Sequence, residues 1–167
     1  MRRIVSASAI FAVVLWGIVP FAPRLRAQDA PKTPAPGITD EGLRTMLDNM
    51  GNEPKKLSKG YLIAMKRDSW TFNIQIVLSD DRTKIGFNSN LGIVENPESI
   101  TAQQWKDLLI GNGDVDPSFF YLAKDAKKLF LHRVIDNRGI DAAFLRQQTE
   151  SFCTNTKDTA KLWAFTK

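Results

Sequence analysis

The sequence predicts an α+β domain in which helices pack against an antiparallel five-stranded sheet, in the order α-β-β-β-α-β-β-α. Three observations lead to this fold class. Residues 70–79 alternate apolar and polar side chains, as a half-buried strand does. Short turn-like stretches separate neighbouring strands, which favours hairpins and therefore antiparallel pairing. Apolar residues recur with helical spacing before, between and after the strands.

The first helix is expected to begin after Thr39, a residue type that caps helix N-termini. Asp40 and Glu41 follow in the first turn, where the helix dipole favours negative charge. Gly51 is expected to end the helix, because glycine readily adopts the left-handed conformation of a C-terminal cap. The apolar stripe of this helix consists of Leu43, Met46, Leu47 and Met50.

Three strands are expected next, at residues 61–65, 70–78 and 85–93. In the second, every even-numbered residue from Trp70 to Leu78 is apolar, so one face of the strand is buried and the other is mainly polar. The third strand keeps its apolar residues at odd numbers, with Ser89 as a gap. Residues 66–69 and 79–82 form the turns, so the sheet begins as a meander.

A short helix follows, because Thr101 and Gln104 have the spacing of a capping box. Trp105, Leu108 and Leu109 supply its apolar side, and Gly111 is expected to end it. Two further strands are predicted at residues 118–123 and 128–135, joined by a hairpin. The last helix should cover about residues 141–164. Its stripe consists of Leu145, Thr149, Phe152, Thr156, Ala160 and Trp163.

Residues 1–27 have the pattern of a secretory signal peptide. Arg2 and Arg3 precede an uncharged apolar stretch, residues 4–19, and prolines then interrupt the chain before Ala27. Cleavage after Ala27 would export the protein to the periplasm or the extracellular space. The alternative is an uncleaved anchor, but the apolar stretch is short for a membrane span of ~20 residues. Cleavage would leave no stable membrane span.

Residues 28–37 are rich in proline and alanine and are predicted to be a linker, so the folded domain covers residues 38–167. The whole chain has a net charge of +5. The leader holds four arginines and no acidic residue, so the mature chain has 19 basic and 18 acidic residues, a net charge of +1. A nucleic-acid partner is therefore not expected, because such proteins need a basic surface to neutralise phosphates.

The sequence offers no catalytic or metal site, and no cofactor is expected. His132 lies mid-strand, where we interpret it as structural, and zinc would need several histidine or cysteine ligands. The stretch from Asn112 starts like a calcium loop, but Pro117 and Ala123 stand where such a loop needs glycine and glutamate. Cys153 lies beside the apolar stripe of the last helix and should be buried. A hydrolase using Cys153 or His132 is the least favoured hypothesis.

Aromatic side chains provide the candidate interaction surface. Three consecutive aromatic residues place large rings on both faces of one strand, so part of the outer face of the sheet should be apolar. Two tryptophans are also large for peripheral helices. Apolar patches of this kind are typical of partner or dimer interfaces. The candidate residues are Trp70, Trp105, Phe119, Phe120, Tyr121 and Trp163.

The chain resembles the YbjN-like group, which shares the fold of type III secretion chaperones (CesT-like). The resemblance lies in residues 43–51, the aromatic strand 70–78, Ser79-Asp80-Asp81, residues 129–133 and Asn137. It implies a homodimer that binds other polypeptides through its helix and sheet surfaces, and it does not imply an enzyme. The leader sets this chain apart from the secretion chaperones, which work in the cytoplasm.

The expected function is therefore that of an exported, non-enzymatic protein-interaction module that forms homodimers and binds a polypeptide of unknown identity. The alternative is a periplasmic carrier that holds a small apolar ligand between the sheet and the C-terminal helix.

Overall fold

The computed structural model describes residues 37–124 and 127–167. The predicted leader, and the linker up to residue 36, lie outside the described residues. The strands are β1 (Lys55–Lys56), β2 (Tyr61–Arg67), β3 (Trp70–Leu78), β4 (Lys84–Ile93), β5 (Ser118–Leu122) and β6 (Lys128–Asp136). The helices are α1 (Asp40–Asn49), α2 (Ala102–Asp114) and α3 (Ala142–Asp158), with short 3₁₀ turns η1 (Pro97–Ser99) and η2 (Ala160–Trp163). Within the described ranges no helix is both long and apolar enough to cross a membrane.

The predicted α+β class and element order are confirmed, and every strand pairing is antiparallel. The strands lie in the order β1-β2-β3-β4-β6-β5, so β2, β3 and β4 form the predicted meander and β5 forms an edge. The sheet has six strands in the part of the chain described, not five. The additional strand, β1, was missed because it consists of two exposed lysines and therefore shows no apolar alternation.

Three predicted helix boundaries are confirmed by their caps. The Thr39 hydroxyl accepts the Gly42 amide at 3.1 Å, and Thr101 and Gln104 form the complete capping box. Gly51 follows α1 with a φ of +81°, the conformation expected of a C-terminal glycine.

Two helix ends differ from the prediction. Helix α2 continues past Gly111 to Asp114, so Gly111 does not end the helix as predicted. A Cβ atom at this position would lie 2.4 Å from Leu162 Cδ1, so glycine lets η2 approach the helix. Helix α3 ends at Asp158, and the chain continues through Thr159 into the 3₁₀ turn η2.

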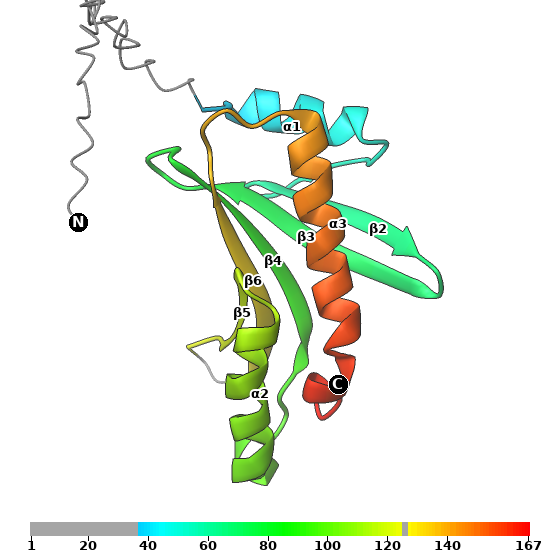
Figure 1. Cartoon of the computed structure of the whole chain (residues 1–167), viewed down its shortest axis with the longest axis vertical. Helices are drawn as coiled ribbons and strands as arrows, with labels where there is room; N and C mark the ends of the chain where they lie inside the picture. Colours follow the sequence, from blue (N-terminus) through cyan, green and yellow to red (C-terminus); the bar gives the residue numbers. More distant parts are fainter. Residues whose placement is uncertain (1–36, 125–126) are drawn as a thin grey trace, which may run out of the picture. The chain divides into compact units, whose positions relative to one another are not determined.

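The hydrophobic core lies between one face of the sheet and helices α1 and α3. Helix α3 runs across this face in Figure 1. The predicted alternation places Ile74 and Ile76 of β3, Phe87 of β4 and Leu131 of β6 on the same buried face. Phe152 of α3 meets Phe87 with ring centroids 6.0 Å apart. Leu43 and Leu47, from the predicted stripe of α1, are fully buried in the same core.

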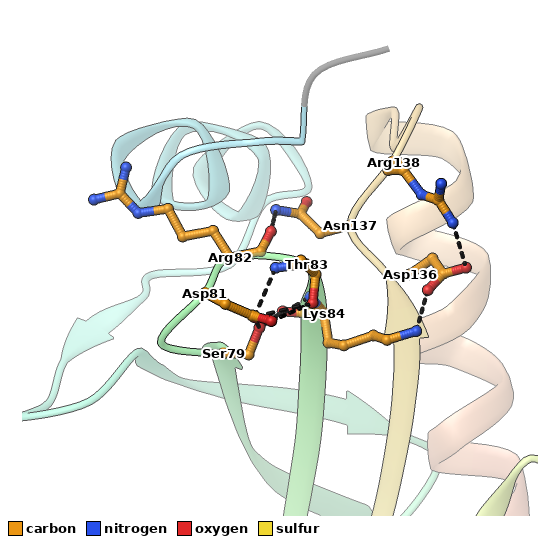
Figure 2. Close-up of polar contacts among 8 residues, drawn as sticks. All are labelled: Ser79, Asp81, Arg82, Thr83, Lys84, Asp136, Asn137 and Arg138. Carbon is orange, nitrogen blue, oxygen red and sulfur yellow. Dashed lines mark hydrogen bonds and ion pairs between the residues drawn. The ribbon is translucent and has the colours of Figure 1, made fainter. Parts of the chain in front are cut away.

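Asn137 joins three segments that are distant in the sequence. Its side chain accepts the Ile38 amide at 3.0 Å and donates to the Ile38 carbonyl at 2.9 Å. It also donates to the Arg82 carbonyl at 2.8 Å (Figure 2). Its own amide bonds to the Thr83 carbonyl at 2.8 Å. The side chain is fully buried. Asn137 therefore ties the start of the domain and the β3–β4 turn to the end of β6.

The β3–β4 turn has its own polar network beside Asn137. Asp81 accepts hydrogen bonds from the Ser79 hydroxyl and from the amide and hydroxyl of Thr83 (Figure 2). These bonds favour the charged carboxylate and lower the pKa of Asp81 to about 2. The residues of the resemblance at 79–81 and at 137 thus define a turn and its anchor.

Candidate interaction surface

Strand β5 presents aromatic rings on both of its faces, as the sequence predicted. Phe119 and Tyr121 are exposed on the face of the sheet opposite α3. Phe120 points to the other side, where it is only 7 % exposed. Because β5 is an edge strand, both kinds of side chain lie at the margin of the sheet.

Helix α2 and strand β5 enclose an apolar groove of about 340 Å³, which we call the α2–β5 groove. Trp105 and Leu109 line it from the helix, and Phe120 and Tyr121 line it from the strand. Leu109 is 71 % exposed, an unusual position for a leucine in a helix that already has a buried stripe. The remaining lining residues are Leu108, Asn112, Leu122 and Leu129.

A cluster of rings lies on the open face of the sheet, next to this groove. Tyr121 stacks on Phe130 of β6 with centroids 5.2 Å apart, and Phe119 meets His132 edge-on at 5.1 Å. Exposed Val134 follows on the same face of β6. We call Phe119, Tyr121, Phe130 and His132 the open-face cluster. Tyr121 lines the groove and also belongs to the cluster, so the two apolar surfaces meet at the edge strand β5.

The structure brings together four of the six predicted residues. Trp105, Phe120 and Tyr121 line the groove, and Phe119 lies in the adjoining cluster. The other two, Trp70 and Trp163, form a separate edge-on pair, 6.1 Å apart, that packs against the core.

Sequence reasoning did not select Leu109 or Phe130 for this surface. Phe130 could have been found, because it alternates in phase with His132 along β6 and so shares its face. Leu109 was assigned to an apolar helix stripe, and no pattern in the sequence distinguishes an exposed stripe residue from a buried one.

The edge of β5 is protected from pairing with another strand. The outward Phe120 amide donates to Asn112 Oδ1 of α2 at 2.6 Å, and the Ser118 amide donates to the Val115 carbonyl at 2.7 Å. These bonds occupy groups that an added strand would need. A partner on this side must therefore contact side chains of the groove and the cluster.

The two residues left open as a hydrolase pair do not meet. His132 lies on the open face, with Nδ1 2.7 Å from Asn88 Oδ1, and burial lowers its pKa. Cys153 lies in the core on the opposite side, with its Sγ 3.9 Å from Met65 Sδ. The prediction that Cys153 is buried is confirmed, since it is 1 % exposed. Across the described residues, no three His, Cys, Asp or Glu side chains gather as metal ligands.

Cys153 should react slowly with iodoacetamide in the folded protein. Burial raises the pKa of its thiol to about 11, so little thiolate is present at neutral pH, and the sulfur is shielded. Mass spectrometry at pH 8 should show little adduct in buffer and rapid labelling in 8 M urea, a ~10-fold or greater difference in rate. Equally fast labelling in both conditions would contradict this assignment.

The interface between the sheet and α3 is filled by side chains. Phe87, Leu145 and Phe152 are fully buried there, and the guanidinium of Arg133 lies 5.8 Å from the Phe152 ring. A cavity at the margin of this interface is lined partly by charged side chains, including Arg67 and Lys157. This packing gives no support to an apolar ligand held between the sheet and α3.

The domain belongs by its architecture to the class of α+β folds found in type III secretion chaperones and YbjN. No protein-family model matches the chain, and no curated protein matches it in sequence. Three solved structures show the fold. YbjN from E. coli aligns with a TM-score of 0.52 and 18 % identity over 73 % of this chain and 91 % of its own.

A chain of the HopA1–SchA chaperone–effector complex aligns with a TM-score of 0.52 and 12 % identity, covering 71 % of this chain and 90 % of that one. A chain of the ExsC–ExsE complex aligns with a TM-score of 0.55 and 10 % identity, covering 77 % and 97 %. The resemblance found in the sequence is thus confirmed as a shared fold.

Proposed function

We propose that this chain is an exported, non-enzymatic protein-interaction module that forms a homodimer and binds an apolar stretch of another polypeptide. The α2–β5 groove and the adjoining open-face cluster are the contact surface. The observation that carries this proposal is that two apolar surfaces meet at Tyr121, with Leu109 largely exposed at the groove.

The chemistry of the groove suits a protein partner. Asn112 is polar, but its side-chain oxygen already accepts the Phe120 amide. The other lining residues offer aromatic and aliphatic carbon. Aromatic side chains are enriched in the apolar buried centre of protein interfaces. The SchA structure, a chaperone–effector complex, supports a polypeptide as the partner of this fold.

Export of the domain is the second part of the proposal, and its support is the leader pattern of residues 1–27. The near-neutral mature chain and the separation of Cys153 from His132 support a role without nucleic-acid binding or catalysis.

Leu109→Asp should convert the dimer to a monomer. A carboxylate at the groove would have to lose its hydration in the interface, so the dissociation constant should rise by about 100-fold or more. Size-exclusion chromatography with light scattering measures the mass at matched concentrations. Phe144→Asp is the control, because Phe144 is also an exposed aromatic residue but lies on α3 and should leave the dimer intact.

The proposal fails if the unmodified protein is a strict monomer and crosslinking in intact cells yields no polypeptide adduct. The groove as the dimer interface fails if Leu109→Asp keeps the same dimeric mass as the unmodified protein and Phe144→Asp.

A further inference from the structure

The end of β4 carries a peptide-binding slot that the chain itself fills. Strand β3 pairs with β4 only as far as Ile74 opposite Ser89, so the last residues of β4 have no β3 partner on that side. Residues Ala164–Lys167, which we call the docked segment, take this position. The Ile93 amide donates to the Lys167 carbonyl at 2.7 Å, and the Lys167 amide donates to the Ile93 carbonyl at 3.1 Å.

These reciprocal bonds are those of one antiparallel strand pair. The Thr166 hydroxyl adds a hydrogen bond to the Leu91 carbonyl at 3.0 Å. Gly92 provides the space for Thr166, because a Cβ atom at Gly92 would lie 2.4 Å from the threonine hydroxyl. Gly92 also has a φ of +149°, which glycine adopts readily. The last residue of the docked segment thus pairs with β4 as a strand does, after a turn in which the Thr166 amide donates to the Trp163 carbonyl at 3.0 Å.

An aromatic side chain is the main anchor of the docked segment. Phe165 meets Trp105 of α2 edge-on, with ring centroids 6.0 Å apart. Trp105 also lines the α2–β5 groove, so the slot is continuous with the proposed contact surface. Two cavities, of about 180 and 280 Å³, adjoin Phe165. Ala164 and Lys167 are exposed, and Phe165 and Thr166 are only partly buried, so the segment is expected to open at a lower free-energy cost than the core strands.

We propose that this slot binds a segment of a partner polypeptide that turns and then pairs with β4 as the docked segment does, with an aromatic residue on Trp105 and one backbone pair to Ile93. The docked segment competes for the slot. The docked segment shows the partner chemistry that fits: an aromatic residue followed by a small β-branched residue and a lysine. Lysine fits because Glu95 accepts the Lys167 ammonium at 2.8 Å. This inference rests on the proposed function, since it specifies how one partner segment is held.

The test uses a fluorescein-labelled peptide of residues 162–167 (LWAFTK) and full-length variants altered only in the docked segment. Phe165→Ala removes the anchor, and Lys167→Pro removes the amide that donates to Ile93. Both leave the slot itself unchanged. The apparent affinity for the peptide rises with the fraction of molecules in which the docked segment has left the slot. Because both variants raise this fraction, each should bind the peptide about 10-fold more tightly than the unmodified chain.

Fluorescence anisotropy measures the affinity, with Phe144→Ala as a control that should match the unmodified chain. A peptide with serine in place of phenylalanine should bind at least about 10-fold more weakly. The proposal is overturned if the peptide binds the unmodified chain, Phe165→Ala, Lys167→Pro and Phe144→Ala with equal affinity. It is also overturned if neither docked-segment variant binds the peptide although both melt at the temperature of the unmodified protein.

Hydrogen exchange of the unmodified chain gives an independent reading. The Ile93 amide should exchange through local opening, faster than the amides that pair β3 with β4. In Phe165→Ala, adding the peptide should protect the Ile93 amide from exchange. Exchange of Ile93 only upon global unfolding would overturn the displaceable segment. Neither the peptide affinity nor the exchange rate of the Ile93 amide depends on Leu109. A failure of the proposed slot can therefore be distinguished from a failure of the proposed dimer interface.

Discussion

Arg133→Ala should lower the free energy of unfolding by about 3–5 kcal/mol, the largest single effect we expect in this domain. Arg133 is 1 % exposed and lies on the core face of β6. Its Nε–H donates to Ser118 Oγ at 2.9 Å, and its terminal nitrogens donate to the carbonyl and side-chain oxygens of Gln148 and to the Ser151 hydroxyl. Alanine removes these bonds, which join β5, β6 and α3, and leaves a cavity.

The volume of the side chain and its charge can be separated with Arg133→Met. Methionine fills much of the same space without a buried charge, so it should cost less than half as much as alanine. Urea unfolding monitored by circular dichroism gives the values. Arg146→Ala, on the exposed side of α3, should stay within about 0.5 kcal/mol of the unmodified protein. A cost below about 1 kcal/mol for Arg133→Ala would contradict this account.

Asn137→Ala should cost about 2–4 kcal/mol. Three hydrogen bonds from one fully buried side chain are lost together, and the carbonyls of Ile38 and Arg82 lose their donor. The start of the domain should also become more mobile, which hydrogen exchange at Ile38 would detect.

Asn73→Ala is the matched control for Asn137, because Asn73 is exposed on the open face of the sheet. It should change the free energy of unfolding by no more than about 0.5 kcal/mol. If Asn137→Ala changed the free energy of unfolding as little as Asn73→Ala, the three side-chain hydrogen bonds of Asn137 would not contribute much to stability.

The sequence predicted most of the fold because its strands are half-buried. Alternation from Trp70 to Leu78 identified the buried face of β3, and the same period along β6 put Arg133 in phase with Leu129 and Leu131 on one face. That arginine is buried because polar atoms of Ser118, Gln148 and Ser151 surround its guanidinium. These partners come from β5 and α3, so local sequence could not reveal them.

The candidate surface was predicted only in part, for a related reason. The aromatic alternation of β5 correctly indicated rings on both faces, but the groove exists because α2 lies beside β5. The docked segment was not predicted, because the last helix was expected to continue to about residue 164 and no return of the chain to the sheet was foreseen. Only the break at Thr159 and the pairing of Lys167 with Ile93 show that the chain turns back to the sheet.

The central claim is that the α2–β5 groove contacts another polypeptide. Site-specific photocrosslinking tests it most directly, with a photoreactive amino acid at Leu109 in one protein and at Phe144 in a matched control, each produced with its leader in intact cells. The account predicts polypeptide adducts from position 109, in an envelope or secreted fraction, at several times the yield from position 144. Equal or absent adducts at the two positions would contradict it.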